Sequence, residues 1–392
     1  MSAMRWRRLG LLGTLYLSQG LPFGFFTQAL PLIMRKRGMS LESIGLSSLL
    51  ALPWALKFVW SPYVDRYGTR KSWILPLQLL TALTLVGTAI ARDAFAVVLA
   101  SVLLTNLLCA TQDIATDGLA VDMLANEERG LANGVQVAGY RVGMILGGGV
   151  LLIFHERLGW VTTFLAMAAI VVVASVPIAF AKEPARAHAE KRPAHFLHFF
   201  TRPGAPRILG IVLTYKIAEA FAAGMLRPYL ADAGMSLADV GWMLGTVGFV
   251  AGLAGALFGG ATVNALGRRR ALIVYGLLQT ASVATYVLAA RGAPNRAVLT
   301  ALCAVEHFAS GTATASLFTA MMDWSRRATS ATDYTVQASA VVIATGAAAT
   351  VSGYSAGALG YAGHFALAAA IGVLSLGPVI FAFPRDADLR ES

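Results

Sequence analysis

Charged side chains are scarce in this sequence. Of its 392 residues, 13% are Asp, Glu, Lys or Arg, whereas a soluble domain usually carries about 25%. So few charges do not cover a water-facing surface of this size, and 57% of the residues are hydrophobic. The composition therefore excludes an ordinary soluble globular protein.

Long stretches also lack charge almost completely. From Arg207 to Arg268, counting both ends, the chain carries only seven charged residues. Segments of roughly 20 mainly apolar residues are typical of membrane-spanning helices. We therefore predict an all-α polytopic membrane protein embedded in a lipid bilayer.

Residue patterns that support catalysis are missing. The two cysteines, Cys109 and Cys303, lie in apolar segments and give neither a metal spacing nor a disulfide framework. The glycines at 147–149 lack the Lys-Ser/Thr pair and the preceding strand of a phosphate-binding loop. With no nucleophile elbow and no zinc spacing either, we predict no enzyme activity, no cofactor and no metal site.

The net charge of +11 would suggest a nucleic-acid partner in a soluble protein. Here the basic residues lie between apolar runs, which is typical of the Lys and Arg bias of cytoplasmic loops. If both termini are cytoplasmic, the loops and tails of that side hold twenty Lys and Arg, and the other side holds eight. We expect an inner (cytoplasmic) membrane protein with both termini cytoplasmic and no nucleic-acid partner. The basic run at 35–37 is an exception.

Apolar runs predict twelve transmembrane helices. They cover residues 9–34, 41–63, 72–91, 94–124, 130–154, 160–181, 206–231, 236–264, 270–290, 296–322, 332–357 and 361–383. A polar, basic, Pro-rich segment separates the sixth helix from the seventh. The predicted division is therefore an N-terminal six-helix bundle at 1–181, a cytoplasmic linker at 182–206 and a C-terminal six-helix bundle at 207–392.

The two predicted halves repeat each other. GMSLESIG at 38–45 recurs as GMSLADVG at 234–241, and VDRYGTRK at 64–71 aligns with VNALGRRR at 263–270. Asp122 and Gln136 likewise match Asp323 and Gln337. Repeated halves commonly enclose a site near the middle of the membrane, although a duplicated bundle without transport activity would repeat in the same way.

These segments carry a family resemblance. VDRYGTRK after the second helix, with its echo after the eighth, resembles the signature loop of the major facilitator superfamily. LYLSQGLPFGF, ATQDIATDGLAVDML and LTYKIAEAF resemble its AmpG-like branch, which includes muropeptide permeases, siderophore permeases of the rhizobactin and pyochelin type, and acetyl-CoA transporters. The chain length is closer to that of the siderophore permeases.

The resemblance implies a major facilitator fold of two pseudo-symmetric six-helix bundles. It also implies a secondary transporter, proton-coupled and working by alternating access, that imports a siderophore-like or muropeptide-like solute. The expected partners are that solute and protons, and the expected state is a monomer. Alternatives are acetyl-CoA-type or other organic-anion transport or efflux by the same fold, and a non-transporting membrane receptor.

Seven ionisable residues fall inside the predicted spans. Such residues are costly in a bilayer and usually face a cavity. Asp113 and Asp117 are four residues apart on one helical face, with Arg141 and Lys57 as partners at matching depths; Lys216 and Glu219 share another face, with Glu306 opposite. We predict a proton-coupling central cavity formed by Asp113, Asp117, Arg141, Lys57, Lys216, Glu219 and Glu306. The alternative is a set of permanent salt bridges.

Two further groups complete the predicted site. The substrate-contact candidates are Gln19, Gln112, Tyr140 and Tyr215, each of which also suits a helix-packing role. The cytoplasmic gating loop contains Asp65, Arg66, Gly68, Arg70 and Lys71 in the first copy, and Asn264, Gly267, Arg268 and Arg269 in the second. Asn264 replaces the aspartate of the first copy, which leaves hydrogen bonding but not a charge at that position.

Overall fold

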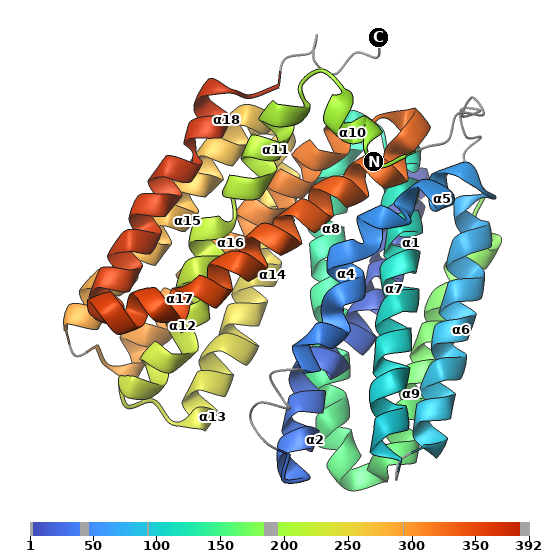
Figure 1. Cartoon of the computed structure of the whole chain (residues 1–392), viewed down its shortest axis with the longest axis horizontal. Coiled ribbons are helices and arrows are strands. Elements are labelled where there is room, and N and C mark those ends of the chain that lie inside the picture. The colour runs from blue at the N-terminus through green and yellow to red at the C-terminus, as the bar shows by residue number, and fades with distance from the viewer. Residues whose placement is uncertain (1–2, 40–46, 92–93, 184–194, 293, 385–392) are drawn as a thin grey trace. The chain divides into compact units, whose positions relative to one another are not determined.

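The computed structural model describes residues 3–39, 47–91, 94–183, 195–292 and 294–384, and every regular element in these ranges is helical (Figure 1). Residues 184–194 of the predicted linker, most of the GMSLESIG segment and the start of the second predicted helix lie outside them. Eight helical stretches of the described residues are long and apolar enough to cross a membrane.

The chain divides into two compact units. Unit 1 contains residues 1–124, 138–196 and 325–339, and unit 2 contains residues 125–137, 197–324 and 340–392. Two stretches, 125–137 and 325–339, therefore belong to the unit built mainly by the other half of the sequence.

Helices of the first half begin and end as follows: α1 Ala3–Gly24, η1 Phe25–Ala29, α2 Leu30–Lys36, η2 Ser47–Ala51, α4 Leu52–Leu56, η3 Lys57–Val59, α5 Ser61–Arg66, α6 Arg70–Ile90, α7 Phe95–Met123, α8 Asn126–Ile145, η4 Leu146–Val150 and α9 Leu151–Phe180. Gly159, at φ 79°, interrupts α9. The elements η1 and η4 are π-helical turns.

Helices of the second half are α10 His198–Thr201, α11 Ala205–Thr214, α12 Ile217–Asp232, α13 Leu237–Val240, η5 Gly241–Val247, α14 Gly248–Leu266, α15 Arg268–Arg291, α16 Arg296–Asp323, η6 Arg327–Thr329, α17 Ser330–Ser375 and α18 Gly377–Phe381. Gly360, at φ 67°, divides α17 into the two segments that the sequence predicts as separate spans.

The second predicted helix is not continuous. Its described part consists of four short helical segments between Ser47 and Arg66. Pro53 and Pro62 stand in the first turns of α4 and α5, where a residue without a backbone N–H starts a helix but does not continue one. The seventh predicted span is also divided, at Tyr215 and Lys216, into α11 and α12.

Each unit has its own apolar core. In unit 1, α6 packs side by side with α7 and α9 (Figure 1), and Leu21, Leu85, Val102 and Phe164 lie in one buried cluster. In unit 2, α14 and α15 pack against α16, and Phe221, Tyr286, Cys303 and Phe365 share a core. Helix packing in a membrane relies on such close contact because lipid is as apolar as the side chains.

Glycines permit close contact in unit 1 between α1 and α8 with its continuation η4. A Cβ atom added to Gly20 would lie 2.0 Å from the carbonyl oxygen of Tyr140, and one added to Gly147 would lie 1.8 Å from that of Leu21. These helices touch backbone to backbone, which fixes the position of α8 along α1.

The described copy of the repeated GMSL motif forms a capped turn before η5. The Ser236 hydroxyl donates to Asp239 at 2.7 Å and accepts from its backbone N–H at 3.1 Å. The hydrogen bond from the Ser236 hydroxyl lowers the pKa of Asp239, assisted by the Ser236 backbone N–H and by Arg296, whose Nη1 lies 3.0 Å away.

Candidate functional site

The first buried polar cluster joins α1, η3 and α7 of unit 1. Lys57 begins the η3 turn, where the helix between Pro53 and Pro62 is interrupted, and its ammonium forms an ion pair with Asp113. The same Nζ lies 3.9 Å from Asp117, which also accepts a hydrogen bond from the Tyr16 hydroxyl at 2.7 Å. Two carboxylates four residues apart therefore share one ammonium, and Asp117 also contacts a phenol; all four groups are buried.

Amide side chains continue this cluster along α1 and α7. Gln19 donates to the Thr116 hydroxyl at 3.1 Å, and Gln112 donates to the Ser18 hydroxyl at 3.4 Å. Both side chains therefore take part in helix packing, and their contact with substrate stays a prediction. The Gln19 Oε1 atom is buried without a hydrogen-bond partner among the described residues, and such an acceptor in a polar site suits a water or a solute.

Tyr140 and Arg141 follow each other on α8 and are both half-buried. The Tyr140 ring lies 5.7 Å from that of Phe23 and 6.3 Å from that of Trp54, measured between centroids. Trp54 is one turn before Lys57. Sequence reasoning overlooked Phe23 and Trp54 because aromatic residues in apolar helices carry no pattern that separates a site from packing.

The second buried cluster lies in unit 2, at the break between α11 and α12. The Lys216 Nζ lies 3.0 Å from Glu219 Oε2 and 3.1 Å from Gln279 Oε1. The Ser310 hydroxyl accepts from Lys216 at 3.3 Å and donates to Glu219 at 2.9 Å. The predicted pair is thus brought together, and Gln279 and Ser310 are members that the sequence did not indicate.

The substrate-contact candidate Tyr215 and the predicted cavity residue Glu306 have other partners. Tyr215 donates its hydroxyl to the Leu272 carbonyl at 2.8 Å, which is a packing contact. Glu306 is buried on α16, with its Oε2 2.6 Å from the Nδ1 of His307. The placement of both polar clusters on one central cavity stays a prediction.

The first copy of the gating loop caps a helix. Asp65 accepts hydrogen bonds from the backbone N–H groups of Ala331 and Thr332 at 3.3 and 2.7 Å, and from the Thr332 hydroxyl at 2.5 Å. These donors belong to the first turn of α17, where backbone N–H groups lack helical partners and favour negative charge. Asp65 therefore connects α5 to the start of α17 within unit 1.

Arg70 completes this first loop. Its guanidinium, 1% exposed, donates to Asp65 at 2.7 Å, to Asp122 at 3.1 Å and to Ser330 at 2.8 Å. A Cβ on Gly118 would lie 2.6 Å from Arg70 Cζ, so only glycine leaves room for this guanidinium. From the sequence alone, Asp122 is identified only as the counterpart of Asp323 in the internal repeat.

The other predicted residues of the first loop have separate contacts. Gly68 has φ +66°, a conformation that favours glycine. Arg66 is exposed over the Tyr67 ring, 5.4 Å from its centroid. Lys71 donates its ammonium to the Ala179 carbonyl.

The second copy has a different chemistry. Asn264 donates its amide to the Glu127 carbonyl near the start of α8, so the position keeps hydrogen bonding without a charge. Neighbouring residues form the ion pairs of this loop. Arg268 Nε lies 2.5 Å from Asp323, and Arg129 Nη1 contacts the same aspartate at 2.8 Å. Gly267 has φ +76°, and Arg269 donates to the Ile380 carbonyl at 2.5 Å.

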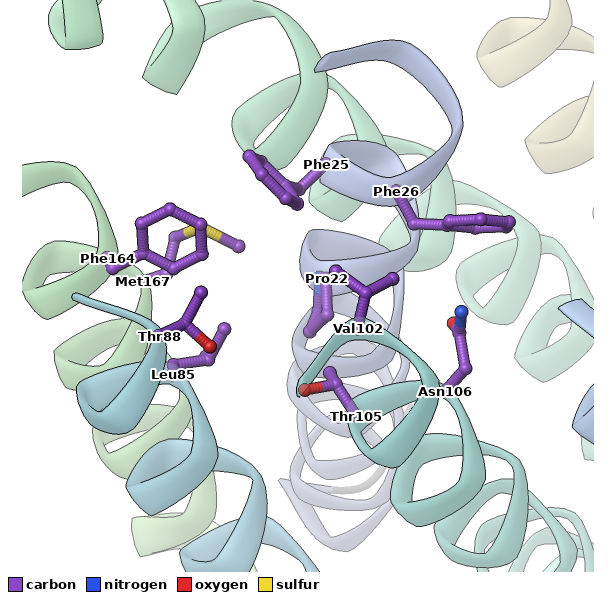
Figure 2. Close-up of a pocket in the computed structure, with 10 residues that line it drawn as sticks. All are labelled: Pro22, Phe25, Phe26, Leu85, Thr88, Val102, Thr105, Asn106, Phe164 and Met167. Atoms are coloured by element: carbon purple, nitrogen blue, oxygen red, sulfur yellow. The ribbon is translucent and has the colours of Figure 1, made fainter. Parts of the chain in front are cut away.

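A small cavity lies among α1, η1, α6, α7 and α9 of unit 1 (Figure 2). Its volume is about 10 Å³, and its lining is mainly apolar, with Thr88, Thr105 and Asn106 as polar members. That space suits about one water molecule and is too small for an organic solute.

Comparison with known proteins identifies the family of the chain. The family model described as Major Facilitator Superfamily matches residues 12–225, more than half of the chain. The fold of the chain is similar to that of the fucose transporter FucP in the outward conformation (TM-score 0.76, 15% identity, 95% of this chain and 98% of that chain). It is also similar to the human organic anion transporter MFSD10 (TM-score 0.75, 14% identity, 96% and 100%). The chain belongs to the Major Facilitator Superfamily.

Within this superfamily, relatives of similar sequence show that the chain is an AmpG-like member. The anhydromuropeptide permease of Escherichia coli K12 is 29% identical over 342 residues, covering 83% of this chain and 70% of the relative. The putative transporter AmpG 4 of Rickettsia conorii is 26% identical over 371 residues, covering 88% and 89%. The chain is therefore a multi-pass membrane transporter of small-molecule solutes and not an enzyme.

Proposed function

We propose that this protein imports a muropeptide-like solute together with protons, by alternating access, across the inner membrane. The observation that carries the proton coupling is the buried group of Lys57, Asp113 and Asp117. The similarity to an anhydromuropeptide permease over 83% of the chain supports the solute class.

Charge balance explains how this cluster would couple protons to solute. Lys57 neutralises one of the two carboxylates that it contacts, and an unbalanced carboxylate in an apolar interior costs several kcal/mol. A proton on the Asp113–Asp117 pair removes that excess charge. If solute binding displaces Lys57 from Asp113, the proton becomes necessary for the same step, which couples the two.

Unit 2 supplies a second polar group of the same kind. Lys216 contacts Glu219, Gln279 and Ser310 and offers donors and acceptors at one place. An anhydromuropeptide carries hydroxyl, amide and carboxylate groups that match such a mixed set. Arg141, half-buried on α8, is the further cation that we assign to the solute site.

The gating loop would control the transport cycle. In this proposal both termini and the loop are cytoplasmic, and the bonds from Asp65 to the start of α17 break when that side opens. The monomer is the proposed working unit.

A ligand panel tests the solute class. We would measure thermal unfolding of the purified protein in detergent with anhydromuropeptides, ferric siderophores, acetyl-CoA and small peptides. A ligand at a hundred times its Kd stabilises the folded state by about 2.7 kcal/mol. We expect the shift with anhydromuropeptides alone. A selective shift with siderophores or acetyl-CoA would instead replace the proposed solute with that class.

A further inference from the structure

Three aromatic rings in unit 1 meet beside the ion pair. Phe23 of α1, Trp54 of α4 and Tyr140 of α8 lie with ring centroids 5.4, 5.7 and 6.3 Å apart. All three are half-buried, whereas a neighbouring core pair, Phe25 and Phe164, is buried. The group, which we call the aromatic triad, therefore keeps part of its ring surface uncovered.

Polar contacts and close packing hold the aromatic triad in place. The Trp54 indole donates to Asn106 Oδ1 at 3.2 Å, and the Asn106 amide donates in turn to the Leu50 carbonyl at 2.9 Å. The backbone of Tyr140 is pressed against Gly20, where a side chain would not fit. A rigid ring surface needs little ordering when a ligand binds.

Hydrogen-bonding groups lie beside these rings. Lys57 is one turn after Trp54, with its Nζ 5.7 Å from the ring centroid. Gln19 is one turn before Phe23 on the same face of α1, and its Oε1 is the buried acceptor without a partner among the described residues. A ligand ring stacked on the aromatic triad would thus lie beside a cation, with a buried acceptor one turn away along α1.

We propose that the aromatic triad is the subsite for a sugar ring of the solute, a pyranose with hydroxyl or acetamide groups. The proposal rests on the proposed function and names the part of the solute that unit 1 recognises. The C–H groups of one pyranose face are weakly positive and stack on the negative faces of aromatic rings. Gln19 accepts from a hydroxyl or amide N–H, and Lys57 donates to a sugar oxygen.

The spacing along α7 fits a solute that carries a charge beyond the ring. Asn106, which anchors Trp54, and Asp113, which pairs with Lys57, are seven residues apart on one helical face. The rise of the helix puts their backbone positions about 10 Å apart, and the long Lys57 side chain brings its ammonium to 5.7 Å from the centroid of the Trp54 ring. One solute can therefore place a sugar on the aromatic triad, within reach of the Lys57 ammonium, while a charged group attached to that sugar reaches the ion pair.

The test uses the purified full-length protein and measures dissociation constants by calorimetry. The probe is the disaccharide of N-acetylglucosamine and anhydro-N-acetylmuramic acid, without its peptide. We expect binding to wild type, at least tenfold weaker binding to Trp54→Ala and Tyr140→Ala, and a change of less than threefold for Trp54→Phe, which keeps an aromatic face. Trp242→Ala, at a 50% exposed tryptophan of η5, is the matched control and should bind as wild type does.

The unfolding temperature of each variant shows whether it is folded. Trp54→Leu or Tyr140→Leu, which keeps apolar volume but removes the aromatic face, replaces any alanine variant that is not folded. Equal affinities of Trp54→Ala, Tyr140→Ala and wild type would overturn the subsite, even if the complete anhydromuropeptide binds as the proposed function requires. Binding of 2,3-dihydroxybenzoate, but not the disaccharide, in a Trp54-dependent way would assign the aromatic triad to an aryl ring instead. If wild type binds neither the disaccharide nor the complete anhydromuropeptide, the proposed function fails and the subsite with it.

Discussion

Lys57 and Lys216 show the same design at the residue scale. Each is a buried lysine at an interruption of a helix, and each contacts a carboxylate. At such a break the backbone does not continue the regular helical hydrogen bonds. The long lysine side chain there reaches partners on neighbouring helices. Both positions combine a charge that a bilayer disfavours with partners that make it tolerable.

Replacing Lys57 with Met should destabilise the protein by about 3–5 kcal/mol, because Asp113 is left buried without its ion-pair partner. The double variant Lys57→Met with Asp113→Leu should recover most of that loss, since neither charge remains. Unfolding in detergent measures both, and the two single variants with the double form a double-mutant cycle.

The matched control is Glu127→Gln. Glu127 is an exposed carboxylate at the start of α8, and its replacement should change the free energy of unfolding by less than about 0.5 kcal/mol. A double variant as unstable as Lys57→Met alone would show that the pair is not a coupled unit.

At this scale the sequence predicted part of the candidate site. Charged residues in apolar helices stand out because burying them is costly, so Lys57, Asp113 and Asp117 could be named in advance. Gln279, Ser310 and Trp54 could not, because neutral polar and aromatic residues are common in membrane helices. Their role depends on which helices are neighbours, which spacing along one helix does not reveal.

The two gating loops differ at the element scale. Asp65 accepts from N–H groups at the start of α17, whereas Asn264 donates to a carbonyl near the start of α8. Each side chain therefore suits the backbone group that it meets. The presence of Asn264 where the first copy has Asp65 follows from this difference, because one side chain meets backbone donors and the other meets a backbone acceptor.

Exchanging the two residue types should be unfavourable in both loops. Asp65→Asn loses a charge-assisted capping bond and its pairing with Arg70. Asn264→Asp places a carboxylate oxygen against the Glu127 carbonyl, but it also gains an ion pair with Arg268, which donates to the Asn264 side-chain oxygen. The repulsion is therefore measured in an Arg268→Met background. We expect each exchange to cost about 1–3 kcal/mol, measured by unfolding in detergent. Asn264→Asp that leaves the stability of Arg268→Met unchanged or higher would contradict the hydrogen-bond direction described here.

The contact between α1 and η4 gives a second prediction at this scale. Gly147→Ala places a Cβ against the Leu21 carbonyl, and overpacking of this kind costs about 1–3 kcal/mol. Gly10→Ala is the matched control, because a Cβ there meets nothing within 4 Å and alanine favours a helix. Unfolding temperatures should fall for Gly147→Ala and stay level or rise for Gly10→Ala.

For the molecule as a whole, composition and internal repetition were enough to predict the fold class. The breaks at Gly159 and Gly360 lie where the sequence separates predicted spans, and the superfamily match confirms the fold class. The exchange of residues 125–137 and 325–339 between compact units was not predictable. It arises from packing of α8 and α17 against distant parts of the chain, which no local pattern records.

In the proposed mechanism, solute movement is coupled to a proton at the Asp113–Asp117 pair. Uptake of a radiolabelled anhydromuropeptide into proteoliposomes, with and without an inward proton gradient, measures this coupling. Wild type should accumulate the solute only when the gradient is present. Asp113→Asn should exchange internal for external solute without accumulating it. Full gradient-driven accumulation by Asp113→Asn, with Glu127→Gln behaving as wild type, would rule out coupling at this pair.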